Sequence, residues 1–275
     1  MRAGTETAAA IIATADALAD AARAATLLHF RTAIAAENKG GAAFDPVTAA
    51  DTLSEARMRA VLARMRPDDG IVGEEFGTLA GTSGLTWILD PIDGTRAYLA
   101  GAPTWGVLIA VADVSGPLYG VIDQPYIGER FAGGLGRAAM TGPAGARTLA
   151  TRPPRPLSEA IVLSTFPEVG TAEERAGFDA VKARARLTRY GLDCYGYALV
   201  AAGQVDLVIE AGLAPYDVAA PIAVITAAGG VVTDWRGRPA HGGGRILAAA
   251  NAAVHAEALA ILAGVPDAAS TSAGA

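Results

Sequence analysis

Residues 90–95, Asp-Pro-Ile-Asp-Gly-Thr, place two carboxylates three residues apart across a tight turn. An apolar segment ends at Asp90, and the proline that follows interrupts a regular strand. Carboxylate oxygens that converge across such a turn can hold adjacent hard cations, and they suit Mg²⁺ better than Zn²⁺. The amides of Gly94 and Thr95 are predicted at the start of a helical segment, where unpaired N–H groups favour an anion such as phosphate. The spacing therefore predicts metal ligands and phosphate donors within one short segment.

Two other groups of acids also lie at the ends of apolar segments. Glu74 and Glu75 come directly after the apolar segment 71–73, and Asp217 precedes a long apolar helix. Each group has a structural alternative: the glutamates as a solvated strand end, and Asp217 as an N-cap. The Asp-Gly pair at Asp93 has one too, as a cap before a glycine turn. Because functional sites tend to lie at such ends, the acids together favour a common metal site.

Three motifs, in this order along the chain, resemble the inositol monophosphatase superfamily of Mg²⁺-dependent phosphatases. They are Gly-Glu-Glu at 73–75, Asp-Pro-Ile-Asp-Gly-Thr at 90–95 and Tyr-Asp-Val-Ala-Ala at 216–220. Residues 45–51, Asp-Pro-Val-Thr-Ala-Ala-Asp, are similar to the superfamily's upstream segment, and the resemblance extends from about residue 8 to residue 262. It implies an α/β (α+β) fold with layers in the order αβαβα, two lobes and a homodimer.

The resemblance also implies a role for each residue that matches a motif. Two or three Mg²⁺ ions would be held by four carboxylates and one backbone carbonyl, those of Glu74, Asp90, Asp93 and Asp217 and that of Ile92. Thr95 and Glu74 would orient or deprotonate the attacking water, with Asp45 behind them. Gly94 and Thr95 would bind the phosphate of the substrate.

Four further segments are similar to the histidinol-phosphate phosphatase branch of this superfamily, namely residues 121–130, 189–206, 210–213 and 231–237. Leu192 departs from the branch, which usually has glycine there, and the loop 39–45 departs from its usual spacing. This resemblance implies that Asp193 and Glu210 face the leaving group and bind the ammonium group of histidinol phosphate. The alternative for Asp193 is an N-cap of a helix that begins at Cys194.

The motifs thus predict a phosphomonoesterase that hydrolyses histidinol phosphate with metal-activated water and without a phosphoenzyme. Inositol 1-phosphate or another small phosphomonoester is the alternative substrate. A regulatory binding role is a different class of function, and the complete set of carboxylates argues against it.

Composition excludes several other classes of protein. The chain has 275 residues, and its 28 acidic and 22 basic side chains give a net charge of −6. Such a balance argues against binding to nucleic acid or an anionic membrane, because phosphate attraction requires clustered basic residues. The uncharged runs 97–112 and 218–233 contain Gly and Pro and are too short for a transmembrane helix. A single cysteine, Cys194, cannot form an intrachain disulfide, and we expect a cytoplasmic protein.

The predicted elements alternate in a way that is typical of α/β architecture. In the first half we expect helices over 5–31 and from a capping box at Thr52–Glu55 to Met65, and strands over 70–73, 86–90, 106–113, 118–124 and 130–133. In the second half we expect strands over 160–164, 187–190, 205–210, 230–234 and 245–249, and helices over 171–184, 194–202, 217–228 and 251–263. The proline-rich segment 142–156 suggests a boundary between two lobes. We therefore expect an N-terminal lobe over 1–147 that carries most metal ligands. We expect a C-terminal lobe over 148–266 that carries the substrate residues and the last metal ligand, followed by a disordered tail over 267–275.

Overall fold

The structure is a computed structural model that describes residues 5–33, 36–38 and 46–267. Its helices are, in chain order, α1 Thr5–His29, α2 Ala49–Met65, α3 Thr95–Leu99, α4 Ala172–Lys182, α5 Asp193–Ala201, α6 Pro215–Ala227 and α7 Ala252–Leu262, with a 3₁₀ turn at Leu157–Glu159. None of these helices has the length and apolar content that a membrane crossing requires.

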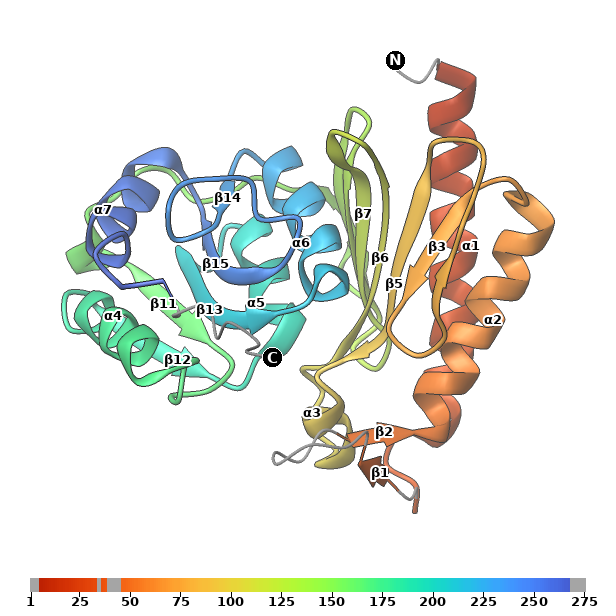
Figure 1. Cartoon of the computed structure of the whole chain (residues 1–275), viewed down its shortest axis with the longest axis horizontal. Coiled ribbons are helices and arrows are strands. Elements are labelled where there is room, and N and C mark those ends of the chain that lie inside the picture. The colour runs from red at the N-terminus through yellow and green to blue at the C-terminus, as the bar shows by residue number, and fades with distance from the viewer. Residues whose placement is uncertain (1–4, 34–35, 39–45, 268–275) are drawn as a thin grey trace, which may run out of the picture.

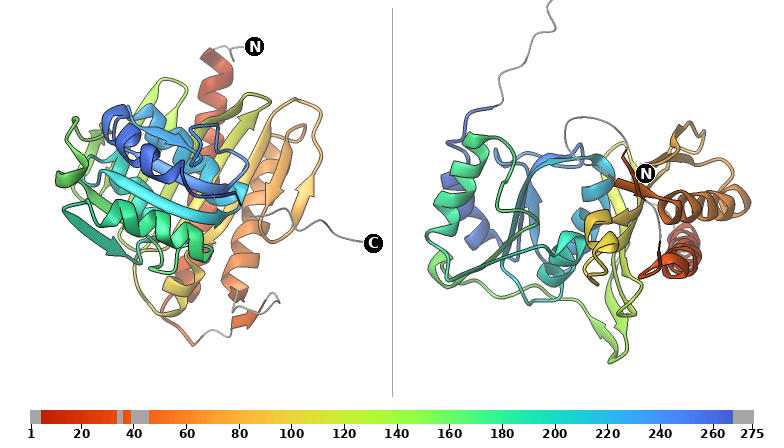
Figure 2. Two further views of the ribbon diagram at one scale, coloured as in Figure 1. Left: turned by 60° about the vertical axis from the view of Figure 1, so that its left-hand side comes forward. Right: turned by 90° about the horizontal axis from the view of Figure 1, so that it is seen from below.

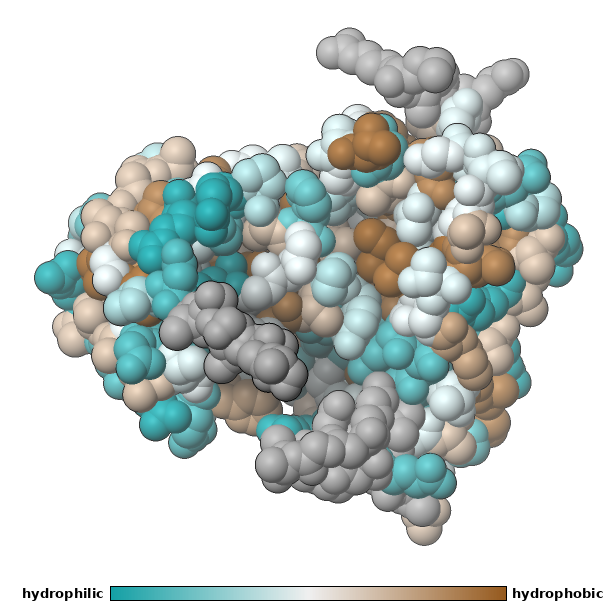
Figure 3. Space-filling model, in the orientation of Figure 1, coloured by the Kyte–Doolittle hydropathy of each residue, from teal (hydrophilic) through white to brown (hydrophobic). Residues whose placement is uncertain are grey.

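Helices and sheets alternate in the order α1 and α2, an eight-stranded sheet, α5 and α6, a five-stranded sheet, and α4 and α7 (Figures 1 and 2). This confirms the layered αβαβα fold that the sequence predicts. Hydrophilic and hydrophobic side chains are interspersed at the left of Figure 3, where α4 and α7 lie, and the polar side chains of α7 are those of His255 and Glu257.

The eight-stranded sheet runs in the order β10-β9-β8-β7-β6-β5-β3-β4 and is antiparallel except between β3 and β5. Its strands are β3 Gly70–Gly73, β4 Gly77–Leu79, β5 Thr86–Asp93, β6 Gly106–Asp113, β7 Gly116–Gln124, β8 Glu129–Gly134, β9 Arg137–Gly142 and β10 Gly145–Thr148. The central strand β6 is buried on both faces. Val107 and Ile109 pack toward α1 and α2, whereas Leu108 and Ala110 pack toward α5 and α6, as the two-residue period of a strand requires.

The five-stranded sheet has the order β12-β11-β13-β15-β14. Its strands are β11 Ile161–Ser164, β12 Leu187–Tyr190, β13 Leu207–Leu213, β14 Val231–Thr233 and β15 Gly244–Ala249. A separate ribbon pairs β1 (Ala36–Asn38) with β2 (Pro46–Thr48). Phe178 of α4 and Leu262 of α7 bury one face of the five-stranded sheet, and Val218 of α6 lies in the core that joins the other face to the eight-stranded sheet.

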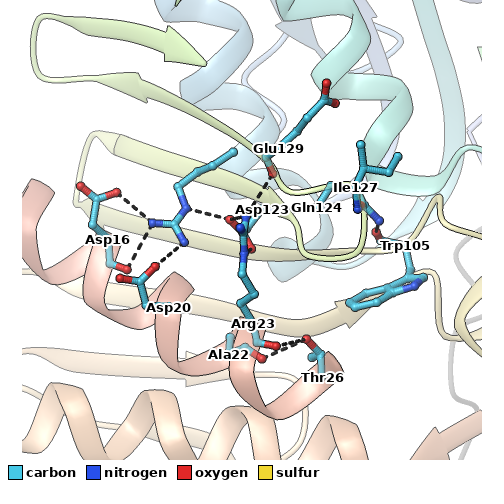
Figure 4. Close-up of polar contacts among 11 residues, drawn as sticks. Asp16, Asp20, Ala22, Arg23, Thr26, Trp105, Asp123, Gln124, Ile127 and Glu129 are labelled. Carbon is cyan, nitrogen blue, oxygen red and sulfur yellow. Dashed lines mark hydrogen bonds and ion pairs between the residues drawn. The ribbon is translucent and has the colours of Figure 1, made fainter. Parts of the chain in front are cut away.

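A buried ion-pair network ties α1 to the eight-stranded sheet (Figure 4). Asp123 of β7 is fully buried and accepts hydrogen bonds from Arg23 of α1 at 2.7 and 3.0 Å and from Arg130 of β8 at 2.7 Å. Arg130 also donates to Asp20 of α1 at 2.7 Å. Because loss of one partner leaves a buried charge without compensation, this network fixes α1 against the sheet.

The predicted capping box at Thr52–Glu55 is wrong. Helix α2 begins earlier, at Ala49, and its box consists of Thr48 and Asp51. The Thr48 hydroxyl accepts the N–H of Ala50 at 3.1 Å, and the Asp51 carboxylate accepts the N–H of Thr48 at 2.8 Å. Strand β2 ends at Thr48, so the helix begins immediately after it, and Glu55 is left for another contact.

Three other local predictions differ from the structure. Strand β5 continues to Asp93 beyond the predicted end at Asp90, because its pairing with β6 shifts register between these residues. Strands β1, β2, β4, β9 and β10 were not predicted, and β10 falls inside the proline-rich segment 142–156. The predicted tail begins at Asp267, whose carboxylate pairs with Arg236 and Arg245; residues 268–275 lie outside the described residues.

Candidate active site

A cavity of about 320 Å³ gathers the predicted site residues that the structure describes. From the eight-stranded sheet and its loops come Glu74, Asp90, Ile92, Asp93, Gly94 and Thr95; from the other half come Asp193, Glu210 and Asp217. Asp45 lies outside the described residues. The cavity is strongly acidic, since the described residues of its lining include seven carboxylates, those of Glu74, Asp90, Asp93, Glu168, Asp193, Glu210 and Asp217, and one arginine, Arg96.

Three of these carboxylates converge closely enough to share cations. One oxygen each of Asp90, Asp93 and Asp217 lies within 4.8 Å of the others. Asp90 and Asp93 stand at the irregular end of β5, and Asp217 lies in the first turn of α6. The Asp217 carboxylate also accepts the N–H of Ala214 at 2.7 Å, so this side chain contributes both to the start of α6 and to the cluster.

The electrostatics of the cluster fit bound cations. Burial raises the pKa of Asp90 well above its ordinary value, and the charges of Glu74, Asp93 and Asp217 raise it further. Burial likewise raises the pKa of Asp217 to about 7, although the hydrogen bond from Ala214 opposes this. The carboxylates of the cluster repel one another, and a bound divalent cation would relieve this repulsion. Carboxylates together with the carbonyl of Ile92 offer the hard oxygen ligands that Mg²⁺ prefers.

The loop between Asp90 and Thr95 is fixed by its own hydrogen bonds. The N–H of Ile92 donates to the Asp90 carboxylate at 3.0 Å, and the Thr95 hydroxyl donates to the carbonyl of Ile92 at 3.1 Å. Gly94 has φ +85°, and a Cβ there would lie 2.7 Å from the carboxyl carbon of Asp193. Only glycine satisfies both conditions, and Gly94 precedes α3 as its N-cap.

Glu74 is positioned by Glu55, which sequence reasoning had assigned to a capping box. The Glu55 carboxylate accepts the N–H of Glu75 at 2.7 Å and the N–H of Phe76 at 3.2 Å, and Arg59 donates to it at 2.8 Å. A Cβ on Gly73 would lie 2.0 Å from a Glu55 oxygen, which explains why glycine precedes the two acids. The turn that carries Glu74 therefore rests on a buried carboxylate of α2.

Asp51 is a second acid that the sequence analysis did not assign to the site. It is buried, its pKa is raised first by burial, and the charge of Glu74 contributes to the shift. It lies in the segment 45–51 that resembles the superfamily's upstream segment, six residues after Asp45. Among the described residues, Asp51 is the acid of this segment within electrostatic reach of Glu74.

Asp193 faces the cavity rather than capping its helix. Helix α5 begins at Asp193 itself, one residue earlier than predicted, and its N-cap residue Leu192 makes no side-chain capping bond. The N–H of Cys194 instead donates to Asp93 at 2.6 Å, which ties α5 to the acidic cluster. Burial and the nearby charge of Glu210 raise the pKa of Asp193 to about 6, against opposing contributions from Thr104 and Arg96.

Glu210 of β13 is held by two residues that sequence reasoning missed. One oxygen accepts the hydroxyl and, at 2.9 Å, the N–H of Thr165; the other accepts the hydroxyl of Tyr197 at 2.7 Å. Tyr197 is buried in α5, and Thr165 follows β11. These bonds hold the Glu210 carboxylate in one orientation at the wall of the cavity.

The fold and the acidic cavity define a phosphatase of the hydrolase class, and comparison with known proteins identifies the family. The model of the inositol monophosphatase family matches residues 8–265, and the chain belongs to this family. It is 38% identical to the chloroplastic bifunctional phosphatase IMPL2 of Arabidopsis thaliana, over 82% of this chain and 64% of that protein. It is 37% identical to the histidinol-phosphatase of Streptomyces coelicolor, over 89% of this chain and 94% of that protein. An inositol monophosphatase from Zymomonas mobilis has the same fold, with a TM-score of 0.83 and 35% identity over 95% of this chain and 100% of that chain.

Proposed function

We propose that this phosphatase is Mg²⁺-dependent and hydrolyses histidinol phosphate to histidinol and phosphate. The observation that carries the proposal is the pair of carboxylates, Asp193 and Glu210, that line the cavity beside the acidic cluster. Sequence similarity to the Streptomyces coelicolor histidinol-phosphatase supports the same substrate.

The residues that would hold two or three Mg²⁺ ions are Glu74, Asp90, Asp93 and Asp217, with the carbonyl of Ile92. All five line the cavity. When bound, Mg²⁺ lowers the pKa of a coordinated water and stabilises negative charge on phosphate and leaving oxygen.

Thr95 would orient the attacking water in this proposal. Its hydroxyl hydrogen is engaged with the carbonyl of Ile92 at 3.1 Å, so its oxygen lone pairs are left to accept a hydrogen from water. Glu74, held on the turn that Glu55 supports, would share this role and take the proton. The amides of Gly94 and Thr95 would bind phosphate oxygens. Together these residues would align water and phosphorus for direct attack.

The charge of the cavity favours a cationic leaving group. Four carboxylates are committed to metal in this proposal, which leaves Glu168, Asp193 and Glu210 against Arg96. Histidinol phosphate carries an ammonium group that this excess of negative charge would attract, whereas inositol phosphate offers neutral hydroxyls. A charge-assisted bond in such a cavity contributes about 1.5–3 kcal/mol.

Inositol 1-phosphate is the second candidate, because the Zymomonas mobilis inositol monophosphatase has the same fold at 35% identity. Phosphate release measured in parallel on histidinol phosphate and inositol 1-phosphate, with Mg²⁺, distinguishes the two. We expect kcat/KM to be at least about tenfold higher for histidinol phosphate. The reverse order would assign the protein to inositol phosphate, and absence of turnover on small phosphomonoesters would favour a regulatory binding role.

The homodimer, the cytoplasmic location and the division into lobes at 1–147 and 148–266 remain predictions. A single cysteine, Cys194, which the structure buries, agrees with a reducing compartment. Light scattering of the purified protein would test the dimer.

A further inference from the structure

Phe166 is a large apolar side chain exposed at the edge of an acidic cavity. It follows Thr165, the residue that holds Glu210, and 44% of its surface is accessible although it lines the cavity. Arg96, from α3 in the other half of the chain, places its guanidinium carbon 5.1 Å from the centre of the Phe166 ring. Two planar groups, one from each half, therefore meet at one side of the cavity.

This pair lies on the same side as the carboxylates that we assign to the leaving group. Arg96 is close enough to Asp193 to lower its pKa against the larger effect of burial. Phe166 is one residue from Thr165, which bonds to Glu210. The carboxylates can bind an ammonium group, but they do not distinguish one amine from another, because the ammonium group is the same in many amines. A flat surface beside the carboxylates could distinguish leaving groups by the shape of their ring.

We propose that Phe166 and Arg96 form a planar wall that selects a leaving group with a flat ring. The inference rests on the proposed function and deepens it, since the imidazole of histidinol would stack on this wall while its ammonium binds Asp193 and Glu210. Phenyl rings and guanidinium planes both stack favourably on flat unsaturated rings. A puckered ring of hydroxyl-bearing carbons presents C–H bonds and hydroxyl groups in place of a flat unsaturated face.

The test compares Phe166→Leu and Phe166→Tyr with the parent protein on three substrates. Leucine keeps apolar bulk and removes the aromatic plane, whereas tyrosine keeps the plane. The substrates are histidinol phosphate and 4-nitrophenyl phosphate, which carry flat rings, and glycerol 2-phosphate, which does not. We expect Phe166→Leu to raise KM for both ring substrates about five- to tenfold, with kcat and the KM for glycerol 2-phosphate nearly unchanged. Phe166→Tyr should restore the parent values.

Tyr126 offers a matched control. It is also an exposed aromatic residue, 47% accessible, with the guanidinium carbon of Arg31 4.4 Å from its ring centre, but it is not among the described residues that line the cavity. Tyr126→Leu should leave the KM for every substrate unchanged. Thermal melting of each variant verifies that the fold is retained.

Two outcomes would overturn the inference: an equal rise in KM for ring and non-ring substrates, or no rise for either ring substrate. Its failure is distinct from failure of the proposed function. A protein that hydrolyses 4-nitrophenyl phosphate but not histidinol phosphate would refute the proposed substrate, and the comparison of 4-nitrophenyl phosphate with glycerol 2-phosphate would still decide whether the wall exists.

Discussion

The carboxylate of Glu55 accepts the backbone N–H of Glu75 at 2.7 Å, across 20 residues of sequence. This bond, with the one from Phe76, fixes the turn from which the proposed metal ligand Glu74 reaches the cavity. The charge of Glu55 is in turn balanced by Arg59 at 2.8 Å. Helix α2 thus supports the turn that carries Glu74.

If Glu55 positions Glu74, Glu55→Gln should weaken the binding of Mg²⁺ more than it lowers kcat at saturating Mg²⁺. Removal of a residue that orients a ligand commonly costs about ten- to a hundredfold in metal affinity. We expect the Mg²⁺ concentration for half-maximal activity to rise by about tenfold, with kcat at saturating Mg²⁺ largely recovered. Glu173→Gln, on the first turn of α4, should leave the Mg²⁺ requirement unchanged. A parent-like Mg²⁺ titration of Glu55→Gln would disprove the positioning role.

Asp93→Asn should abolish turnover while leaving the fold intact. The substitution keeps the shape of the side chain and can still accept the N–H of Cys194, but it removes one charge from a cluster in which burial raises the pKa of Asp93. Because the acids repel one another without metal, we expect the metal-free variant to melt at the parent temperature or slightly above it. Phosphate release and thermal melting in chelator check both parts. Activity within a few-fold of the parent would remove Asp93 from the set of ligands.

Thr95→Ala removes the hydroxyl that we assign to the attacking water and retains the backbone amide. Substrate affinity should therefore survive, while kcat falls by about a hundredfold or more, as loss of proton-transfer assistance commonly produces. Steady-state kinetics on histidinol phosphate separate the two constants. A raised KM with unchanged kcat would show that Thr95 binds substrate and does not handle water.

Asp69 makes an independent prediction about stability, away from the cavity. Burial alone would raise its pKa, but hydrogen bonds from Arg66, Ser83 and the indole of Trp87 outweigh burial and lower the pKa below 3.8. A lowered carboxyl pKa adds stability above the unfolded-state pKa, and this stability is lost as the pH falls through the folded-state value. Asp69→Ala should cost about 3 kcal/mol at pH 7, because it leaves buried donors unpaired.

Urea unfolding at pH 7 and near pH 3 checks this prediction. The difference between Asp69→Ala and the parent should shrink at the lower pH, since the parent carboxylate is then increasingly protonated. Asp68→Ala changes the exposed neighbouring acid and should have little effect at either pH. An equal difference at both pH values would mean that the charge of Asp69 does not contribute.

Short-range patterns made the centre of the site predictable from sequence. Asp90 and Asp93 belong to one turn, so their spacing alone indicated that they converge, and Gly94 signalled the turn. The alternation of elements indicated α/β architecture, and the layered αβαβα arrangement was implied by the family resemblance. Thr48 and Thr52 each stand three residues before an acid, and because both patterns satisfy a capping box, sequence alone could not choose between them.

The supports of the site could not be predicted, because they bridge distant parts of the chain. Thr165 reaches Glu210 across 45 residues, and its type and local sequence carry no signal of that contact. In the sequence Glu55 fits a capping box with Thr52, and only the fold brings the Glu75 turn against its carboxylate. Strands β9 and β10 are short and half exposed, so they lack the alternation that marks a buried strand.

The measurement that tests the central claim most directly is the ratio of kcat/KM values for histidinol phosphate and inositol 1-phosphate in the parent and in Asp193→Ala. The side chain lines the cavity, does not cap its helix, and is assigned here to the ammonium group of the substrate. We predict a loss of about ten- to a hundredfold on histidinol phosphate and little change on inositol 1-phosphate. Equal losses on the two substrates would show that Asp193 is structural, and would contradict the assignment of histidinol phosphate as the substrate.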